Sequence, residues 1–183
     1  MIGKEILLLL RFIVGSVFMQ AKYSVKDICI VALFSAIIFV MTVVPSIPIP
    51  LGYAHLGDAA IMLAGYYGGK KKGAIASALG SAMADFIGGY PLWIVPTLII
   101  KYCMGRSAAV DAPFWSLRTL MGFSLSAICL VVGYTVAGAI LYGGLEAGLS
   151  STPGLIAEGA VNLVAAYAVG ALLNKAGFAQ LLK

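Results

Sequence analysis

The stretch ICIVALFSAIIFVMTVVPSIPIP, residues 28–50, decides what kind of fold this chain adopts. Its first part, residues 28–44, carries no charge and approaches the roughly 20 apolar residues that a membrane-spanning helix needs. Pro45, Pro48 and Pro50 then follow, and a helix cannot continue through them because proline lacks the backbone N–H donor. The stretch therefore predicts a membrane helix that ends in an irregular loop.

The whole chain shares this apolar character. Of its 183 residues, 62% are hydrophobic and only 10% are charged, whereas soluble domains carry about a quarter charged residues. Such a chain lacks the polar side chains that would cover a water-facing surface. At roughly 20 residues per span, six spans use about 120 residues and leave about 60 for short connections. We therefore expect a single all-α, polytopic membrane domain.

Further apolar runs follow, separated by short connections that contain glycine, proline or charged residues. They cover residues 57–69, 73–87, 92–104, 119–142 and 154–173. The connection before the last run, residues 143–153, is expected to be a loop because it is rich in glycine and ends in proline. Together these runs predict six transmembrane helices within residues 22–183.

Residues 1–21 do not fit this pattern. Their apolar run, residues 6–19, is shorter than a span and is broken by Arg11, so an interfacial helix, a poor signal sequence and an upstream extension are all open. We expect an interfacial or peripheral segment, since Arg11 interrupts the apolar core that a signal peptide needs.

The basic residues predict the orientation of the helices. With the N-terminus inside, one side of the membrane receives Lys22 with Lys26, Lys70 to Lys72, Lys101 with Arg106 and Arg118, and Lys175 with Lys183. The opposite connections, residues 45–56, 88–91 and 143–153, contain no Lys or Arg. Because positive residues concentrate on the cytoplasmic side, this pattern predicts that both termini are cytoplasmic. The net charge of +5 is thus explained by topology, and we expect no nucleic acid as a partner.

Metal and catalytic chemistry lack the residues that they need. The chain has one His and three separated cysteines, so it contains neither CxxC nor HExxH and has no second imidazole for a zinc site. We therefore expect no metal and no cofactor. A membrane enzyme would need a nucleophile beside a base, and a secondary carrier often shows inverted repeats. Neither feature is evident in the sequence, but both classes stay as rivals.

Polar residues gather on the expected outer side, where the short runs 57–69 and 92–104 leave room for loops that line a cavity. His55 lies in one of these loops. Glu158 and Asn162 are four residues apart and share one face of the last helix. They could hold a ring with hydroxyl and nitrogen groups, or form an interhelical hydrogen-bonded pair. We expect them to form part of a pocket.

Three residues near the outer ends of the helices have two open interpretations each. An ionised Asp85 would cost several kcal/mol in hydrocarbon without a partner, so it contacts a ligand or anchors the turn at residues 88–90. Tyr90 and Trp93 flank Pro91 and either stack on a planar ligand or belong to an interfacial aromatic belt.

Two charged residues are expected to play structural roles. Lys101 lies near the inner end of its run and is expected to extend its ammonium group to the cytoplasmic boundary. Asp58 stands near the start of the run 57–69 and is expected to cap that helix.

A group of residues in the central third of the chain carries a family resemblance. They are His55-Leu56-Gly57-Asp58-Ala59-Ala60, Gly73, Gly80, Asp85, Gly88-Gly89-Tyr90-Pro91, Trp93, Pro96-Thr97, Lys101 and Gly105. This signature resembles the substrate-binding S components of energy-coupling factor (ECF) vitamin transporters, in their riboflavin-transporter-like branch. The likeness extends over residues 22–173 and is weak outside the central third. The Ala32-xxx-Ala36 pattern is similar to the docking motif of this family.

The resemblance implies a subunit of the prokaryotic cell membrane that captures a vitamin or precursor near the outer face. Such a subunit docks, through Ala32 and Ala36, onto a membrane T component driven by two cytoplasmic ATPases. This chain has no GxxxxGK[ST] motif, so ATP hydrolysis would come from those partners and the chain itself would not be an enzyme. With the resemblance included, the expected substrate-binding residues are His55, Asp85, Tyr90, Trp93, Thr97, Glu158 and Asn162.

The residue types in this pocket limit the substrate. A carboxylate, an amide and aromatic rings, without a dedicated cation, suit a small neutral or protonatable heteroaromatic alcohol better than a polyanion. Within the family this favours pyridoxine or hydroxymethylpyrimidine. Riboflavin and a queuosine precursor stay as alternatives.

Overall fold

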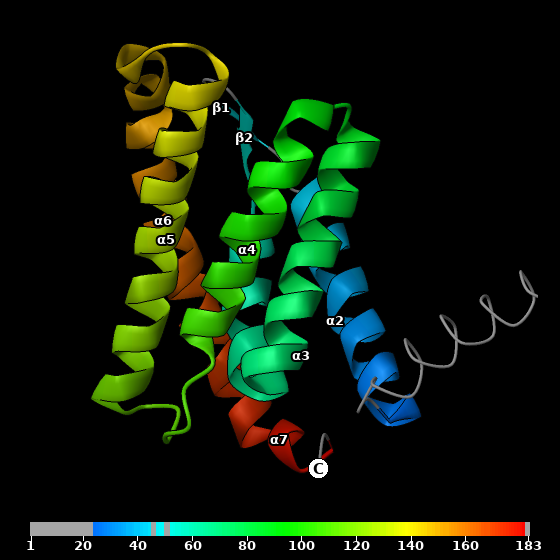
Figure 1. Ribbon diagram of the computed structural model, residues 1–183. Helices are drawn as coiled ribbons and strands as arrows, with labels where there is room; N and C mark the ends of the chain where they lie inside the picture. Colours follow the sequence, from blue (N-terminus) through cyan, green and yellow to red (C-terminus); the bar gives the residue numbers. More distant parts are fainter. Residues whose placement is uncertain (1–23, 45–46, 50–51, 182–183) are drawn as a thin grey trace, which may run out of the picture.

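A computed structural model describes residues 24–44, 47–49 and 52–181 of the chain. The expected segment at residues 1–21 lies outside these ranges. Almost all of the described residues are helical (Figure 1), which confirms the all-α class. The described strands form a short antiparallel hairpin, in which β1 (Ile47–Ile49) pairs with β2 (Gly52–Ala54).

Helix α2 (Val25–Val43) corresponds to the first apolar run. Its N-terminus is fixed by Ser24, whose side chain accepts the Asp27 N–H, while the Asp27 carboxylate accepts the Ser24 N–H. Ile30, Phe34 and Ile38 recur every four residues and form the buried face. Ala32 and Ala36 are exposed on another face of the helix.

Helix α3 (Gly57–Gly88) contains the second and third apolar runs as two antiparallel halves. The helix is interrupted at Gly69, whose φ of 77° lies in the left-handed region that favours glycine. The chain reverses there and the halves pack closely, since a Cβ atom at Gly73 would lie 2.4 Å from the Ala64 carbonyl oxygen. The lysine run that follows Gly69 is thereby placed at the tip of this helical hairpin.

The remaining helices complete the bundle. They are the 3-10 helix η1 (Pro91–Trp93), α4 (Ile94–Ala108), α5 (Leu117–Leu141), α6 (Leu145–Lys175) and the short α7 (Phe178–Leu181). The halves of α3 pack against α2 and α4, and α5 packs against α4 and α6 (Figure 1). With α3 counted as two halves, the helices from α2 to α6 match the six predicted runs one to one. Three of them, α2, α5 and α6, are long and apolar enough to cross a membrane.

The predicted loop at residues 143–153 is wrong, because α6 begins at Leu145 and continues through Pro153. Close packing against α5 stabilises this first part of the helix. A Cβ atom at Gly148 would lie 2.2 Å from the Thr135 carbonyl oxygen, and the Thr135 and Thr152 hydroxyls are 2.8 Å apart. Contacts between helices thus outweigh the local preference of glycine and proline for a loop.

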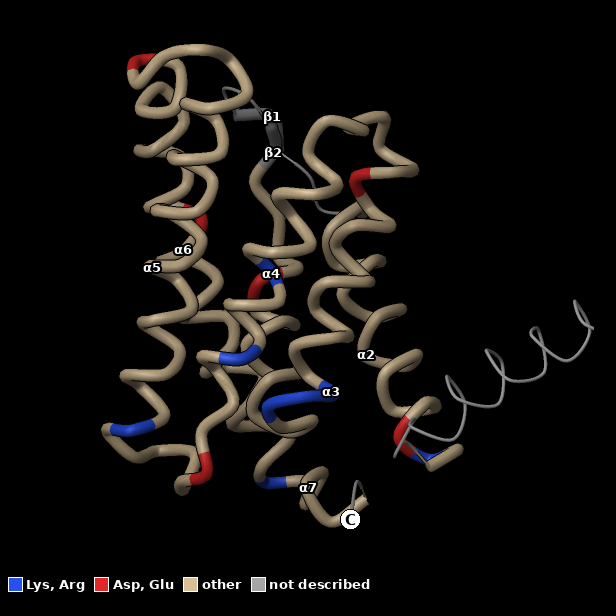
Figure 2. Tube along the Cα trace, viewed as in Figure 1, with Lys and Arg blue, Asp and Glu red and all other residues tan. Residues whose placement is uncertain are grey.

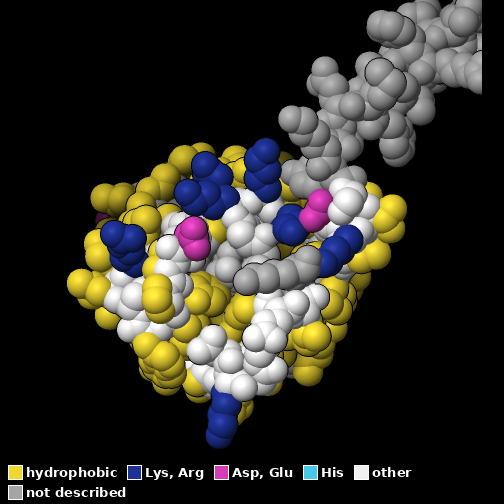
Figure 3. All heavy atoms as spheres, turned by 90° about the horizontal axis from the view of Figure 1, so that it is seen from below, with side chains coloured by type: hydrophobic (Ala, Val, Ile, Leu, Met, Phe, Trp, Pro, Cys, Tyr) yellow, Lys and Arg dark blue, Asp and Glu magenta, His cyan; other side chains and the backbone are white. Residues whose placement is uncertain are grey.

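Charged residues are distributed unevenly along the bundle. Lys and Arg gather toward the end where α7 lies, together with some acidic residues, while the opposite end shows acidic residues alone (Figure 2). Seen from below, basic side chains surround this end of the molecule (Figure 3). The described basic residues are thus concentrated at one end of the bundle.

Candidate functional site

The centre of the candidate site is an ion pair between α3 and α4. Lys101 Nζ donates to Asp58 Oδ1, and the side chains are 2% and 0% exposed. Both structural expectations for these residues are wrong. Lys101 does not reach the end of the bundle, because the Asp58 carboxylate neutralises its ammonium group inside. Asp58 does not cap α3, since Leu56 occupies the N-cap position without a side-chain bond.

Helix α4 presents a polar face to this centre. Trp93, Thr97 and Lys101 recur every four residues and are all buried, so they form one continuous face that begins at η1. Thr97 Oγ1 lies 2.9 Å from the Tyr134 hydroxyl oxygen of α5, and Lys101 Nζ lies 5.1 Å from the centre of the Tyr134 ring. The Trp93 ring contacts the same tyrosine at a centroid distance of 5.5 Å.

Sequence analysis missed Tyr134, Lys101 and Asp58 as members of this site. The four-residue spacing of Trp93, Thr97 and Lys101 was the available signal for Lys101, because it places a lysine on the same helix face as two site candidates. No comparable spacing singles out Tyr134, which stands alone within an apolar helix.

Helix α6 contributes Glu158 and Asn162, which bind the backbone at the entrance to α3. Glu158 Oε1 accepts the His55 N–H at 2.9 Å. Asn162 Oδ1 accepts the Ala59 N–H at 2.8 Å, and its Nδ2 donates to the carbonyl oxygens of His55 and Glu158 at 2.7 and 2.9 Å. The two side chains share one face, as predicted, and they fix residues 55–59 against α6.

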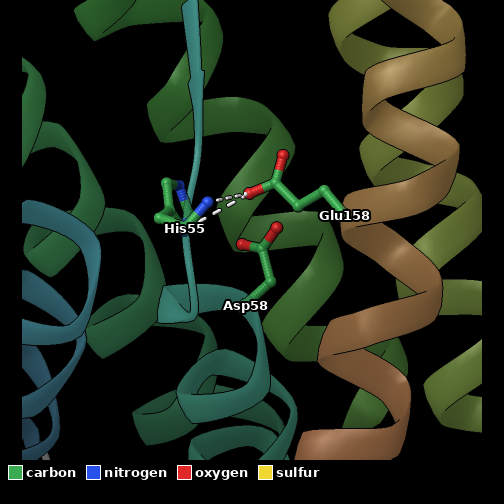
Figure 4. Close-up of side chains that lie close together, drawn as sticks. All are labelled: His55, Asp58 and Glu158. Atoms are coloured by element: carbon green, nitrogen blue, oxygen red, sulfur yellow. Dashed lines mark hydrogen bonds and ion pairs between the residues drawn. The ribbon is translucent and has the colours of Figure 1, made fainter. Parts of the chain in front are cut away.

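The imidazole of His55 is directed into the same space (Figure 4). Its Nδ1 accepts the Gly57 N–H at 3.1 Å, which requires that this nitrogen carry no proton. Burial lowers the pKa of His55, which lies in the connection before α3, to about 4. The ring is therefore neutral near pH 7, and its 3.5 Å approach to Glu158 Oε1 is not an ion pair.

His55, Asp58 and Glu158 also bring potential metal-ligand atoms within 4.8 Å of one another (Figure 4). Lys101 already supplies the positive charge beside Asp58, and the His55 Nδ1 lone pair is occupied by Gly57. A metal ion would have to break both interactions. We therefore assign no metal to this cluster.

The outer candidates Asp85, Tyr90 and Trp93 differ in their burial and contacts. Asp85 is 7% exposed near the end of α3, and its carbonyl oxygen accepts the Tyr90 N–H at 2.8 Å in the turn. Tyr90 lies at the surface, 36% exposed, whereas Trp93 is only 6% exposed. The two aromatics that flank Pro91 thus have different environments, and Trp93 is the one directed toward Tyr134.

Two buried polar atoms of the site have no hydrogen-bond partner among the described residues. They are the acceptor Asp58 Oδ2 and the donor Trp93 Nε1. Leaving such a group unpaired costs about 1–3 kcal/mol, so buried polar groups are normally satisfied. One acceptor and one donor left open beside aromatic rings are the features that a small heteroaromatic ligand would satisfy.

Matches to known proteins include a family model and two relatives. Residues 22–175 match the family model described as the ECF-type riboflavin transporter, S component. A protein of Pyrococcus woesei described as an uncharacterized protein in gap 3′ region is 39% identical over 111 residues, 57% of this chain and 72% of that protein. The thiamine precursor transporter HmpT of Lactococcus lactis subsp. cremoris is 27% identical over 123 residues, 66% of this chain and 71% of that protein.

Proposed function

The chain belongs to the family of ECF-type riboflavin transporter S components, and on that premise we propose that its substrate is a small heteroaromatic vitamin or precursor bound beside Lys101. Membership makes the chain a membrane protein and a substrate-capture subunit for vitamin uptake, not an enzyme. The observation that carries the proposal is the unpaired buried acceptor and donor, Asp58 Oδ2 and Trp93 Nε1, within the matched residues.

The proposed substrate is hydroxymethylpyrimidine or pyridoxine. Either ring has groups that can donate to Asp58 Oδ2 or accept from Trp93 Nε1, and a flat face to stack on the aromatic side chains. Lys101 adds a cation to the pocket expected from the sequence, but Asp58 neutralises it. The pair therefore adds no net charge that would attract a polyanion. The relative named as a thiamine precursor transporter favours the pyrimidine.

The binding residues proposed for this substrate are those of the sequence prediction together with Asp58, Lys101 and Tyr134. Glu158 and Asn162 belong to the site through residues 55–59, which they hold in place. A ligand could bond them directly only if this segment moved. Riboflavin, after which the family is described, and a queuosine precursor are the alternatives.

We also propose six transmembrane helices with both termini in the cytoplasm of the prokaryotic cell. The uneven charge distribution along the bundle supports this orientation (Figure 2). A membrane T component and two cytoplasmic ATPases are the proposed partners. The exposed Ala32 and Ala36 of α2 would form the docking face.

Isothermal titration calorimetry of the detergent-purified protein tests the proposed function. The titrants are hydroxymethylpyrimidine, pyridoxine and riboflavin, each with and without a chelator. We expect one equivalent of hydroxymethylpyrimidine or pyridoxine to bind, with no effect of the chelator. Tight binding of riboflavin alone would select the alternative substrate. The absence of binding across the B vitamins and their precursors would overturn the proposal.

A further inference from the structure

The buried cluster at the centre of the site has unbalanced charges. Its side chains come from four helices and the connection before α3: His55 from that connection, Asp58 from α3, Lys101 from α4, Tyr134 from α5 and Glu158 from α6. His55 is neutral because its Nδ1 accepts a hydrogen bond. Two ionised carboxylates, Asp58 and Glu158, would therefore face a single ammonium group, and one negative charge would remain buried.

Such a charge is expensive in this position. Asp58 is 0% exposed and Glu158 is 6% exposed, so water does not solvate them freely. An isolated buried carboxylate is disfavoured by several kcal/mol, and like charges close together cannot both ionise easily. Two carboxyl groups that share one site commonly resolve this by sharing one proton.

The hydrogen bonds around the two carboxyl groups leave a place for that proton. Lys101 occupies Asp58 Oδ1, and the His55 N–H occupies Glu158 Oε1. Asp58 Oδ2 is buried without a partner among the described residues. One carboxyl oxygen of each residue lies within 4.8 Å of one from the other, a separation that a single bridging water spans (Figure 4).

We propose that Asp58 and Glu158 bind one proton between them in the ligand-free protein, carried on Glu158 and donated toward Asp58 Oδ2. The cluster is then electrically neutral and its open acceptor is satisfied. One consequence rests on the proposed function. A ligand that displaces this proton must replace it with a donor, so the site selects rings that carry an N–H group or a positively charged nitrogen.

Infrared spectroscopy of the full-length, ligand-free protein in detergent near neutral pH tests the proposal. A protonated carboxyl group has a C=O stretching band that is separate from the carboxylate bands. We expect one such band, shifted in D2O and lost in both Glu158→Gln and Asp58→Asn. In each variant Lys101 neutralises the carboxylate that remains. Glu146→Gln, on the exposed first turn of α6, is the matched control and should retain the band.

A second measurement, on the wild-type protein, tests the proposal even if the variants do not fold. The chain contains three glutamates, so labelling glutamate carboxyl groups with 13C should shift the band in the wild-type protein. A wild-type spectrum without a protonated carboxyl band would overturn the proposal. A band that survives both substitutions, or that does not shift on glutamate labelling, would overturn it too. Because no vitamin is present, these outcomes are independent of the calorimetric test of function.

Discussion

The centre of the bundle and the end where α7 lies, the inner end in the proposed orientation, are both rich in polar and aromatic side chains. They differ in how many of their polar groups are hydrogen-bonded. At the inner end the Tyr66 hydroxyl donates to the Ala112 carbonyl oxygen at 3.0 Å, and the Tyr66 ring packs against Phe114 and Phe123. At the centre, Asp58 Oδ2 and Trp93 Nε1 lack partners among the described residues. We interpret the saturated cluster, whose polar groups are hydrogen-bonded, as structural, and we propose that the unsaturated one binds the ligand.

The largest expected effect is at the central ion pair. Lys101→Met should lower the free energy of unfolding by about 3–5 kcal/mol, because it leaves a buried carboxylate without its partner. Adding Asp58→Asn should restore most of that stability, since the double variant buries no unpaired charge. Denaturant titration in detergent measures both values. If Lys101→Met were as stable as the wild type, the pair would not be the buried charge centre described here.

Asn162→Ala should have the next largest effect. The change removes the bonds to Ala59 and His55 and leaves their buried backbone groups unpaired, which costs about 1–3 kcal/mol of stability. Affinity for the vitamin should fall as well, because residues 55–59 lose their anchor on α6. Thermal unfolding and calorimetry on the same sample separate the two effects. Weaker binding with unchanged stability would instead indicate direct contact between Asn162 and the ligand.

The inner end provides the contrasting substitution. Tyr66→Phe removes one satisfied hydrogen bond while it keeps the ring, so stability should fall by about 0.5–1.5 kcal/mol. Vitamin affinity should stay at the wild-type value, since Tyr66 lies in the saturated cluster. A clear loss of affinity in this variant would contradict the division of the molecule into a structural and a binding region.

The smallest effect on the isolated protein is expected on the exposed face of α2. Ala36→Phe should leave both stability and vitamin affinity nearly unchanged, because Ala36 makes no contact in the core. Uptake by cells that also express the T component and ATPases should be lost, since a bulky side chain prevents close helix approach. Normal uptake by this variant would place the docking surface elsewhere.

The arrangement of helices follows largely from local features of the sequence. Apolar runs, the prolines after Val44 and the glycine at position 69 predict where the helices lie and where they end. The exception, residues 143–153, depends on packing of Gly148 against α5, which no local pattern reveals. Helix positions are thus determined locally, except where contacts between helices overrule the residue preference.

The site could be predicted only in part, because its charges are paired across the fold. Glu158 and Asn162 share a face by their spacing, and the structure agrees. Asp58 and Lys101 are 43 positions apart, so neither spacing nor composition connects them. Each taken alone favours an ordinary cap or a boundary lysine, and only the folded bundle shows that the two neutralise each other.

The most direct test of the central claim is the affinity of Trp93→Phe for hydroxymethylpyrimidine or pyridoxine, measured by calorimetry beside its stability without ligand. The change removes the unpaired Nε1 donor and retains an aromatic ring. We predict roughly a 3- to 10-fold loss of affinity, the value of one hydrogen bond, with ligand-free stability unchanged or increased because a buried unpaired donor is removed. Unchanged affinity together with lower stability would contradict the account, since Trp93 would then be a structural residue like those of the inner end.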